Sequence, residues 1–303
     1  MRERRLIVNA DDFGLTRGIT DGIILAHRYG FLTSTSLMAN MPAAKYAVDR
    51  LLSAPRLGIG IHLNICTGRP ILPPHEIPSL VDGEGHFHAP HIMIRKLWTW
   101  RASSREIEAE FRAQIRWMRD RGVVPEHADS HHHMHLYPAA VMPFIRALNS
   151  EELLCARAPR SSVWPKGKSV GGPHEGSVGR RLSVHSYRSA LQLIAFRNLR
   201  MPESRISFLS RDRHNLAALG ECWKAALANL PPGTFELACH PGLFERGFSE
   251  TDRIRTLREE ELYWLTNREW RDVIEGSGVQ LITYRDLFKT HGRQPVAHEA
   301  AAL

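Results

Sequence analysis

The chain has 303 residues, of which 43% are hydrophobic and 24% are charged, so it is long enough for one large domain or two small ones. Lysine and arginine outnumber aspartate and glutamate by 40 to 32, which gives a formal charge of +8 and a pI near 9.6. This charge fits an anionic partner, such as nucleic acid or an acidic membrane surface. The arginines are scattered along the chain, however, and an ordinary solvated basic surface explains them more simply.

The cysteines and the amino terminus bear on the compartment. The four cysteines are widely spaced with no CxxC pair, which argues against a zinc–cysteine cluster or a disulfide framework and favours a reducing compartment. The charged residues 1–5 precede an apolar run that is too short for a signal peptide. No later run approaches the roughly 20 apolar residues that cross a bilayer. We expect a cytoplasmic protein and leave open a peripheral contact with the inner face of the membrane.

Apolar, β-rich runs alternate with helical patterns, which is typical of βα units around a parallel sheet. The expected strands span residues 6–10, 33–39, 57–63, 127–131, 206–209, 235–240 and 279–283. The expected helices span residues 20–30, 43–53, 103–121, 138–148, 188–199, 216–230, 254–266 and 268–275. No internal repeat or break in composition divides the chain. We therefore predict a single domain over residues 1–289, a size that single-domain α/β barrels commonly reach.

Two long segments and the tail fall outside this alternation. Residues 66–92 are rich in proline, glycine and histidine, and so long a loop inside a compact domain usually has a function. Residues 159–181 are rich in glycine, serine, proline and basic side chains, and we expect an excursion or a mobile lid there. The tail over residues 290–303 has little to bury and should be frayed.

Two adjacent carboxylates, Asp11 and Asp12, follow the first expected strand. Adjacent carboxylates repel each other when both are ionised, so a fold seldom places them at a strand end without a cation or a proton to share. The carboxyl ends of parallel strands are also where active sites form in α/β folds. We hypothesise that the pair holds a metal ion and a water molecule. The alternative is a helix N-cap with a solvated neighbour.

Two more strand ends carry side chains that can bind metal. His62 lies in a Gly-Ile-His-Leu-Asn run, and residues 129–135 read Asp-Ser-His-His-His-Met-His. If that segment is extended, its alternate residues share a face, namely Asp129, His131, His133 and His135. Imidazole and carboxylate suit zinc and similar ions, and an open site lets such an ion activate water. His62 alone is more often a core histidine. The histidine cluster alone favours a metal site, with a solvated loop or an adventitious metal binder as the alternative, and the three strand ends together favour one common site.

His240 ends a further expected strand and precedes a Pro-Gly turn. A histidine in this place is suited to general acid catalysis, and a purely structural role is the alternative.

These residues belong to an ordered set of short motifs. In chain order they are Asn-Ala-Asp-Asp-Phe-Gly, Thr-Ser-Thr-Ser, Gly-Ile-His-Leu-Asn, Asp-Ser-His-His-His-Met-His, Ala-Cys-His-Pro and Ile-Thr-Tyr-Arg-Asp-Leu. The set covers about residues 4–288 and resembles the YdjC-like carbohydrate deacetylases. The resemblance implies an α/β fold built as an irregular, TIM-like (β/α) barrel of parallel strands. It also implies one divalent metal ion and hydrolysis of the acetamido group of an N-acetylated sugar.

Residue by residue, the resemblance assigns the metal ligands to Asp12, His62 and His131. It assigns the general base to Asp11 and the general acid to His240. The remaining polar residues are expected to contact the substrate or to orient the ligands, and they are Asn64, Asp129, His133 and His135. Two histidines and one carboxylate suit zinc best, and also nickel, cobalt or manganese, or magnesium with more waters. No oligomeric state follows from the sequence.

The motifs resemble two branches of the family that act on different substrates. Residues 68–74 and 77–82 look closer to the hopanoid-associated, HpnK-like branch, which would act on an N-acetylglucosaminyl lipid. Residues 129–135 look closer to the ChbG-like branch, which acts on chitooligosaccharides. The basic helix at 188–199 would suit an anionic membrane surface, although a charged outer helix face is the plainer alternative. We lean slightly toward a glycolipid. Three tryptophans either stack on sugar or pack in the fold: Trp98, Trp100 and Trp164.

Three other classes of function are weighed against this one. The charge motivates a nucleic-acid-binding protein, but the sequence has neither a motif nor a dense basic patch, and we expect no nucleic acid. A metal phosphoesterase uses the same side chains, but it usually holds a second metal about 3.5–4 Å away, and the ligands here suffice for one. A catalytically silent sugar-binding protein would not need Asp11 and His240.

Overall fold

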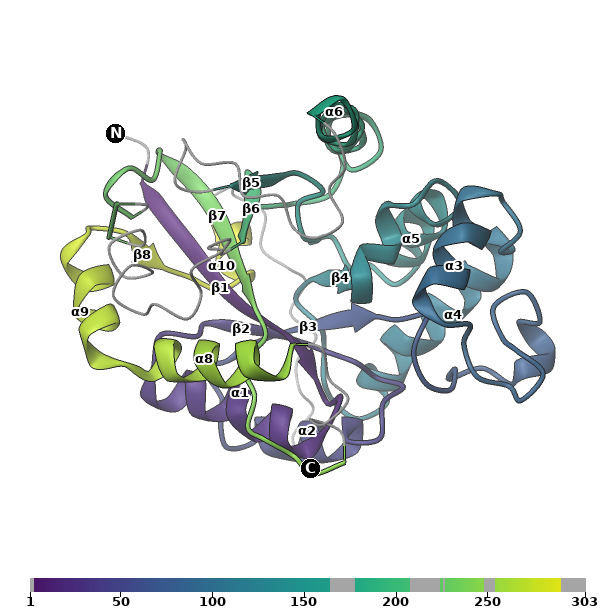
Figure 1. The fold of residues 1–303 in the computed structure, drawn as a ribbon, viewed down its shortest axis with the longest axis horizontal. Helices are drawn as coiled ribbons and strands as arrows, with labels where there is room; N and C mark the ends of the chain where they lie inside the picture. The colour runs from purple at the N-terminus through teal and green to yellow at the C-terminus, as the bar shows by residue number, and fades with distance from the viewer. Residues whose placement is uncertain (1–2, 164–177, 208–223, 226, 248–253, 290–303) are drawn as a thin grey trace.

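The structure is a computed structural model that describes residues 3–163, 178–207, 224–225, 227–247 and 254–289 (Figure 1). Several expected features lie wholly or mostly outside the described residues: Trp164, Cys222, the segment 164–177 of the expected lid, most of the helix at 216–230, and the tail at 290–303.

A parallel sheet forms the centre of the molecule. In the described part of the chain it has eight strands in the order β4-β3-β2-β1-β7-β6-β5, with β8 paired to β1. The strands are β1 (Arg4–Phe13), β2 (Ser34–Leu37), β3 (Gly58–Leu63), β4 (Ala128–Ser130), β5 (Ser161–Val163), β6 (Ser204–Ser207), β7 (Gly233–Cys239) and β8 (Gln280–Leu281). Every pairing between named strands is parallel, as the alternation of strands and helices predicts.

The sheet curls into a half-barrel, and single parallel bridges link its two ends. Ala128 at the start of β4 bridges to Ala156, and Cys155 bridges to Arg200 ahead of β6. The predicted fold class, an irregular (β/α) barrel of parallel strands, is therefore confirmed. The irregularity lies in these bridges, because the segment around residue 156 completes the curve without forming a full strand.

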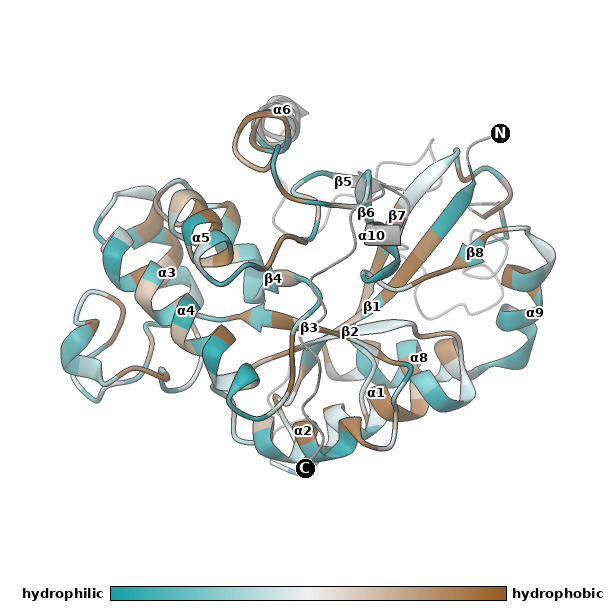
Figure 2. Ribbon diagram, turned by 180° about the vertical axis from the view of Figure 1, so that it is seen from behind, coloured by the Kyte–Doolittle hydropathy of each residue, from teal (hydrophilic) through white to brown (hydrophobic). Residues whose placement is uncertain are grey.

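The helices cover the outside of the sheet. They are α1 (Arg17–Tyr29), α2 (Ala44–Leu51), α3 (Pro90–Trp98), α4 (Ser104–Arg119), α5 (Pro138–Ser150), α6 (Val178–Ile194), α8 (Arg255–Thr266), α9 (Arg268–Gly276) and α10 (Asp286–Lys289), with 3-10 turns η1 (Pro74–Glu76) and η2 (His131–Leu136). In Figure 1, α1, α2 and α8 lie along one side of the sheet, and α3, α4 and α5 group beside β4. Figure 2 shows the hydrophobic residues concentrated on the central strands and on the helix faces turned toward them.

β1 is the central strand because it pairs with β2, β7 and β8. Its apolar residues Leu6, Ile7 and Val8 are completely buried, and each buried side chain of this size contributes about 1.5–3 kcal/mol. The strand is longer than the expected 6–10 and continues to Phe13, so Asp11 and Asp12 lie within the strand, at the register shift between Ala10 and Phe13, rather than after it. The chain thus runs along β1 from the centre of the core directly to the two carboxylates.

Three other predictions from the sequence can be compared with the observed helices and loops. The expected helix at 188–199 is α6, which starts earlier, at Val178. Residues 66–92 form a long connection that contains η1 and ends inside α3. Among the described helices, none combines the length and apolar character needed to span a membrane. The single domain over residues 1–289 stays a prediction.

Candidate metal centre and active site

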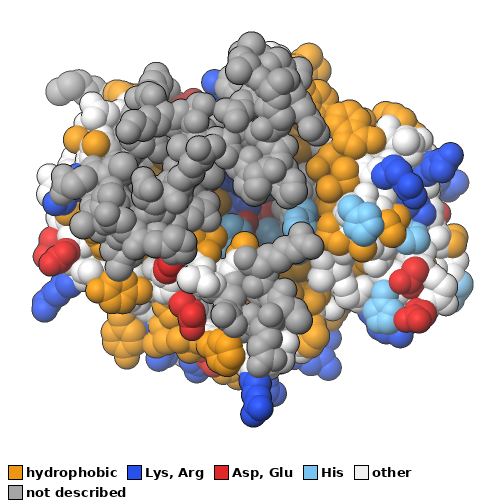
Figure 3. Space-filling model, in the orientation of Figure 1, with side chains coloured by type: hydrophobic (Ala, Val, Ile, Leu, Met, Phe, Trp, Pro, Cys, Tyr) orange, Lys and Arg blue, Asp and Glu red, His pale blue; other side chains and the backbone are white. Residues whose placement is uncertain are grey.

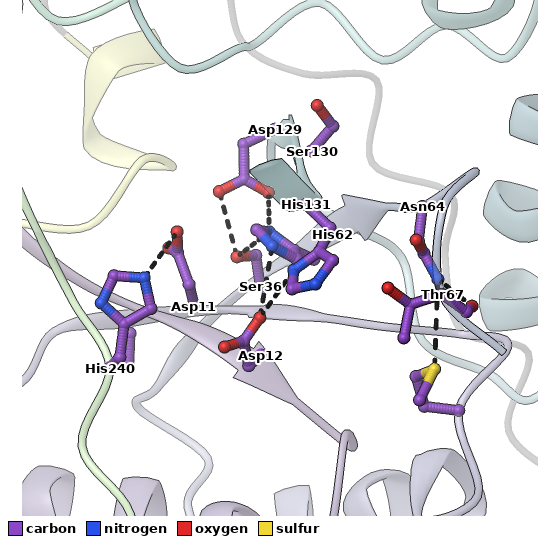
Figure 4. A network of polar contacts seen from close by, with 12 residues as sticks. Asp11, Asp12, Ser36, His62, Asn64, Thr67, Asp129, Ser130, His131 and His240 are labelled. Carbon is purple, nitrogen blue, oxygen red and sulfur yellow. Dashed lines mark hydrogen bonds and ion pairs between the residues drawn. The ribbon is translucent and has the colours of Figure 1, made fainter. Parts of the chain in front are cut away.

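Four strands of the sheet, β4, β3, β1 and β7, deliver polar side chains to the same end of the sheet (Figure 4). Asp11 and Asp12 lie at the end of β1, and His240 follows β7 directly. His62 on β3 lies beside Asp129 on β4 in the register of the two strands. Parallel pairing aligns the carboxyl ends of strands, which is why residues far apart in sequence meet here. Figure 3 shows histidine and charged side chains at the bottom of a hollow on this face.

Asp12, His62 and His131 form the candidate metal centre. Asp12 Oδ1 lies 3.0 Å from His131 Nδ1 and 3.5 Å from His62 Nε2, and the three ligand atoms lie within 4.8 Å of one another. Asp12 Oδ1 is buried, and among the described residues these two imidazole nitrogens are the groups that face it. A carboxylate oxygen buried between two imidazoles needs a positive charge beside it, which a protonated imidazole or a cation among these atoms would supply. The residues therefore fit a divalent ion held by one carboxylate and two imidazoles, ligands typical of zinc.

The backbone of Asp12 explains how both adjacent carboxylates reach one site. Consecutive residues of a regular strand point to opposite faces of the sheet. Asp12, however, has a left-handed φ of 68°, and the pairing of β1 with β2 shifts register between Ala10 and Phe13. Aspartate tolerates this conformation better than most residues. The local turn brings Asp12 to the same edge as Asp11, and strain of this kind is concentrated at functional sites.

Asp129 orients His62. The Nδ1–H group of His62 donates to Asp129 Oδ1 at 2.7 Å, and Ser36 Oγ donates to Asp129 Oδ2 at 3.1 Å. This leaves His62 Nε2 directed at Asp12, the arrangement that a carboxylate imposes on a metal-ligating histidine. Burial opposes protonation of His62, but the Asp129 carboxylate outweighs it and raises the pKa of His62 to about 9. A cation bound by His62 Nε2 would therefore compete with a proton at neutral pH.

The histidine-rich segment is not extended beyond Ser130, so the expectation that its alternate side chains share one face is wrong. Residues 131–136 form η2, with left-handed φ values of 51° at His132 and 53° at His133. His133 Nε2 accepts a hydrogen bond from Arg205 at 2.5 Å. His135 is buried against Phe144, with its ring centroid 4.6 Å away, and its Nδ1 bonds to Ser130 Oγ. Only His131 of the cluster joins the metal-competent atoms among the described residues.

Arg157 holds Asp11, and the sequence analysis did not identify it. Its guanidinium bonds to both Asp11 oxygens at 2.6 and 2.8 Å, to Glu236 at 2.7 Å and to Asp129 at 2.7 Å. Burial raises the pKa of Asp11, but the Arg157 charge outweighs it and the net pKa is lowered. Asp11 is therefore ionised at neutral pH. The available signal was charge inside apolar runs, at Arg157 between two alanines and at Glu236 within a buried strand.

A second group of metal-competent atoms comprises Asp11, His62 and Asp129. Arg157 Nη1 lies within 2.8 Å of both carboxylates of this group. The guanidinium already supplies the positive charge there, and His62 is shared with the first group. Of the two groups, Asp12, His62 and His131 are therefore the better candidate to hold an ion.

His240 lies between Asp11 and α8. Its Nε2 is 3.8 Å from Asp11 Oδ2 and its Nδ1 is 4.0 Å from Glu261 Oε2. The backbone N–H of His240 donates to the same Glu261 carboxylate. The His240 side chain is 32% exposed, so it is open to a substrate in the hollow. Glu261 was not identified from the sequence, because a glutamate on a charged helix carries no distinguishing signal.

The remaining expected residues lie farther from the ligands. Asn64 is buried and holds the start of the 66–92 segment: its Nδ2 donates to Thr67 O at 2.7 Å and its Oδ1 accepts from Cys66 N–H at 3.0 Å. Trp98 and Trp100 are 55% and 66% exposed. Trp98 packs edge-on against Tyr137, with ring centroids 5.9 Å apart. Asn64 is therefore engaged with the loop, while both tryptophans offer open ring surface.

The chain resembles known proteins over most of its length. The YdjC-like protein family model matches residues 5–276. A carbohydrate deacetylase of Brevibacillus brevis is 32% identical over 286 residues, which cover 93% of this chain and 99% of the relative. One from Halalkalibacterium halodurans is 40% identical over 146 residues, but this match covers only 48% of this chain and 59% of that protein. A crystal structure from Enterococcus faecalis, provisionally titled a cellobiose-phosphate cleavage protein, has a TM-score of 0.75 at 27% identity, covering 94% and 99% of the two chains.

These matches confirm the resemblance drawn from the motifs and the expectation of an enzyme of the carbohydrate deacetylase class. The hopanoid-associated branch is not distinguished by them and stays a prediction. The chain belongs to the YdjC-like family of carbohydrate deacetylases.

Proposed function

We propose that the protein is a metal-dependent hydrolase that removes the acetyl group from an N-acetylated sugar. The observation that carries the proposal is the buried Asp12 Oδ1, which faces two imidazole nitrogens within 3.5 Å beside an ionised Asp11. The names of the relatives supply the substrate class. The site supplies the groups that amide hydrolysis needs: a cation site, a base and an acid.

Asp12, His62 and His131 would hold one divalent ion, with zinc the best match and magnesium, nickel, cobalt or manganese compatible. When bound, such an ion would polarise the acetamido carbonyl and lower the pKa of water. Asp129 keeps the His62 ring in the orientation that presents Nε2 to this site.

Asp11 is the proposed general base. Arg157 fixes both of its oxygens, so its carboxylate cannot rotate. Oδ1 also accepts from Asn9 Nδ2 at 3.0 Å, so Oδ2, the oxygen nearer His240, is the one that keeps a lone pair for a water proton. The lowered pKa of Asp11 keeps it ionised at the cost of some basicity. A positioned base of this kind contributes roughly 10²–10⁴-fold to the rate.

His240 is the proposed general acid. The amine leaves an amide poorly unless it is protonated, and His240 is a partly exposed titratable group beside Asp11. Glu261 accepts the His240 backbone N–H and so fixes the turn that carries the ring. His133 and His135 are engaged with Arg205 and Ser130, and we propose that they support η2 rather than bind the ion.

The proposed substrate is an N-acetylglucosamine unit, either of a glycolipid such as a hopanoid-linked sugar or of a chitooligosaccharide. A glycolipid would bring the protein to the inner face of the membrane, as its basic charge allows. Trp98 and Trp100 offer exposed rings on which a sugar could stack. The alternatives, a single-metal phosphoesterase and a basic nucleic-acid-binding protein, are not favoured, because the family match and the relatives are of the carbohydrate deacetylase class.

The test is acetate release from N-acetylglucosamine oligomers and from an N-acetylglucosaminyl lipid, with and without a chelator. We expect acetate from at least one class, abolished by the chelator and restored by a divalent metal. Absence of acetate from both classes after metal loading would refute the proposal. Preference for the lipid at equal concentration would assign the glycolipid branch.

A further inference from the structure

The two carboxylate oxygens of Asp12 have different contacts, because Arg258 on α8 bonds to only one of them. It is a buried side chain, and its Nη2 donates to Asp12 Oδ2 at 2.8 Å. The other oxygen, Oδ1, faces His62 and His131. One oxygen of the carboxylate is therefore committed to a guanidinium, while only the other faces the candidate metal centre.

The guanidinium is itself held in place by the turn that carries His240. Arg258 Nη1 donates to the His240 carbonyl at 3.4 Å, and the Arg258 carbonyl accepts from the Gly242 N–H at 3.2 Å. A Cβ on Gly242 would lie 3.3 Å from Arg258 Cδ, so the aliphatic part of Arg258 packs directly on this turn. Both ends of the residue are thus anchored, and the guanidinium has little freedom to leave Asp12.

We propose that Arg258 is a positioning residue that restricts Asp12 to a single metal-ligating oxygen. The inference rests on the proposed function, because it requires an ion at Asp12, His62 and His131. Carboxylates can bind a cation through one oxygen or through both. The charge-assisted hydrogen bond from Arg258 competes with a second bond from Oδ2 to the ion. Restricting Asp12 in this way keeps a coordination position open, as catalytic sites require.

The positive charge of Arg258 should also affect the affinity of the site for a metal ion. A guanidinium beside a metal ligand repels a bound cation, so it lowers metal affinity while preserving the open position. Removing it should release Oδ2 and remove the repulsion together. The variant should then bind metal at least as tightly as the wild type and yet turn over more slowly, a combination that simple damage to the fold does not produce.

The test uses Co²⁺ as the probe ion in wild-type protein and in Arg258→Met. Visible absorption of protein-bound Co²⁺ weakens as ligands are added around the ion, so a second oxygen from Asp12 should reduce the band. For Arg258→Met we expect a loss of band intensity per bound ion, a cobalt Kd no weaker than that of the wild type, and a kcat about 10- to 100-fold lower with KM unchanged. Arg258→Lys, which keeps a cation beside Oδ2, should recover the wild-type band and most of kcat.

The matched control is Arg271→Met on α9, where Arg271 pairs with Glu275 on the exposed surface at 3.1 Å. It should leave the cobalt band, Kd and kcat unchanged. If Arg258→Met does not fold, Arg258→Leu serves in its place, because a shorter apolar side chain without a donor also releases Oδ2, and the same loss of band intensity is expected.

Failure of the proposed metal centre and failure of the proposed role of Arg258 would give different results. If wild-type protein takes up no cobalt, or His131→Ala takes up as much as the wild type, the proposed metal centre itself is refuted. If the wild type binds cobalt and the folded Arg258 variant shows the same band per bound ion, the role of Arg258 is refuted. Weaker cobalt binding with an unchanged band would also refute it, since Arg258 would then only support the fold.

Discussion

Replacing Arg157 by methionine should cost a large part of the stability of the protein. The guanidinium is 1% exposed and contacts Asp11 at 2.6 Å, Asp129 at 2.7 Å and Glu236 at 2.7 Å. All three carboxylates are buried. Removing one partner of a buried ion pair costs about 3–5 kcal/mol, because the remaining charge is left without compensation. We expect Arg157→Met to fall in this range, out of the roughly 5–15 kcal/mol that stabilises a typical domain.

The loss should depend on pH, with a sign set by the carboxylates. In the wild type, Arg157 overcomes burial and lowers the pKa of Asp11 and of Asp129. These groups therefore stabilise the fold above their unfolded pKa of about 4, and that stabilisation is lost only as the pH falls below about 4. Without the guanidinium, burial raises both pKa values, so the variant should regain stability as the pH falls from about 8 to about 5.

The assay is urea unfolding of metal-free protein at several pH values between about 8 and 5. The control is Arg146→Met, which removes an exposed ion pair with Glu108 and should change the free energy of unfolding by less than about 1 kcal/mol at every pH. If Arg157→Met lowers the free energy of unfolding no more than the control does, Arg157 does not compensate the buried carboxylates as we infer. A gap from the wild type that widens as the pH falls would contradict the same inference.

Asp11→Asn should retain bound metal but lose about 10²–10⁴-fold in kcat for acetate release, because Asp11 is placed as the base and not as a ligand; a near wild-type rate would contradict that role. His131→Ala should lose both metal and activity, and metal analysis that finds wild-type content would remove His131 from the ligand set. Asp129 overcomes burial and raises the pKa of His62 to about 9, so the apparent zinc affinity should rise about tenfold per pH unit from pH 7 toward 9. Calorimetry that finds the affinity independent of pH there would contradict the role of His62 as a ligand that must lose a proton.

The sequence predicted the convergence of those candidate residues whose signal is local. Asp11, Asp12 and His62 stand at the ends of short apolar runs, and parallel pairing makes such ends converge. The choice of His131 among four histidines needed the family resemblance. The geometry of that segment could not be foreseen, because the left-handed backbone at His132 and His133 depends on tertiary packing that overrides the local pattern.

The residues that sequence reasoning missed act across long separations. Arg157 is 146 residues from Asp11, and Arg258 is 246 residues from Asp12. Arginines are abundant in this basic chain, so neither could be distinguished from a solvated side chain by composition. Only their burial against carboxylates identifies them, and burial is a property of the assembled fold.

The most direct measurement is acetate release from an N-acetylglucosamine oligomer or lipid by metal-stripped protein titrated with zinc. We expect no acetate at the start and a rate of acetate release that rises to a plateau at one ion per chain, with no such rise in His131→Ala. Acetate release that is undiminished in the stripped protein, or a fully loaded protein that releases none, would contradict this expectation.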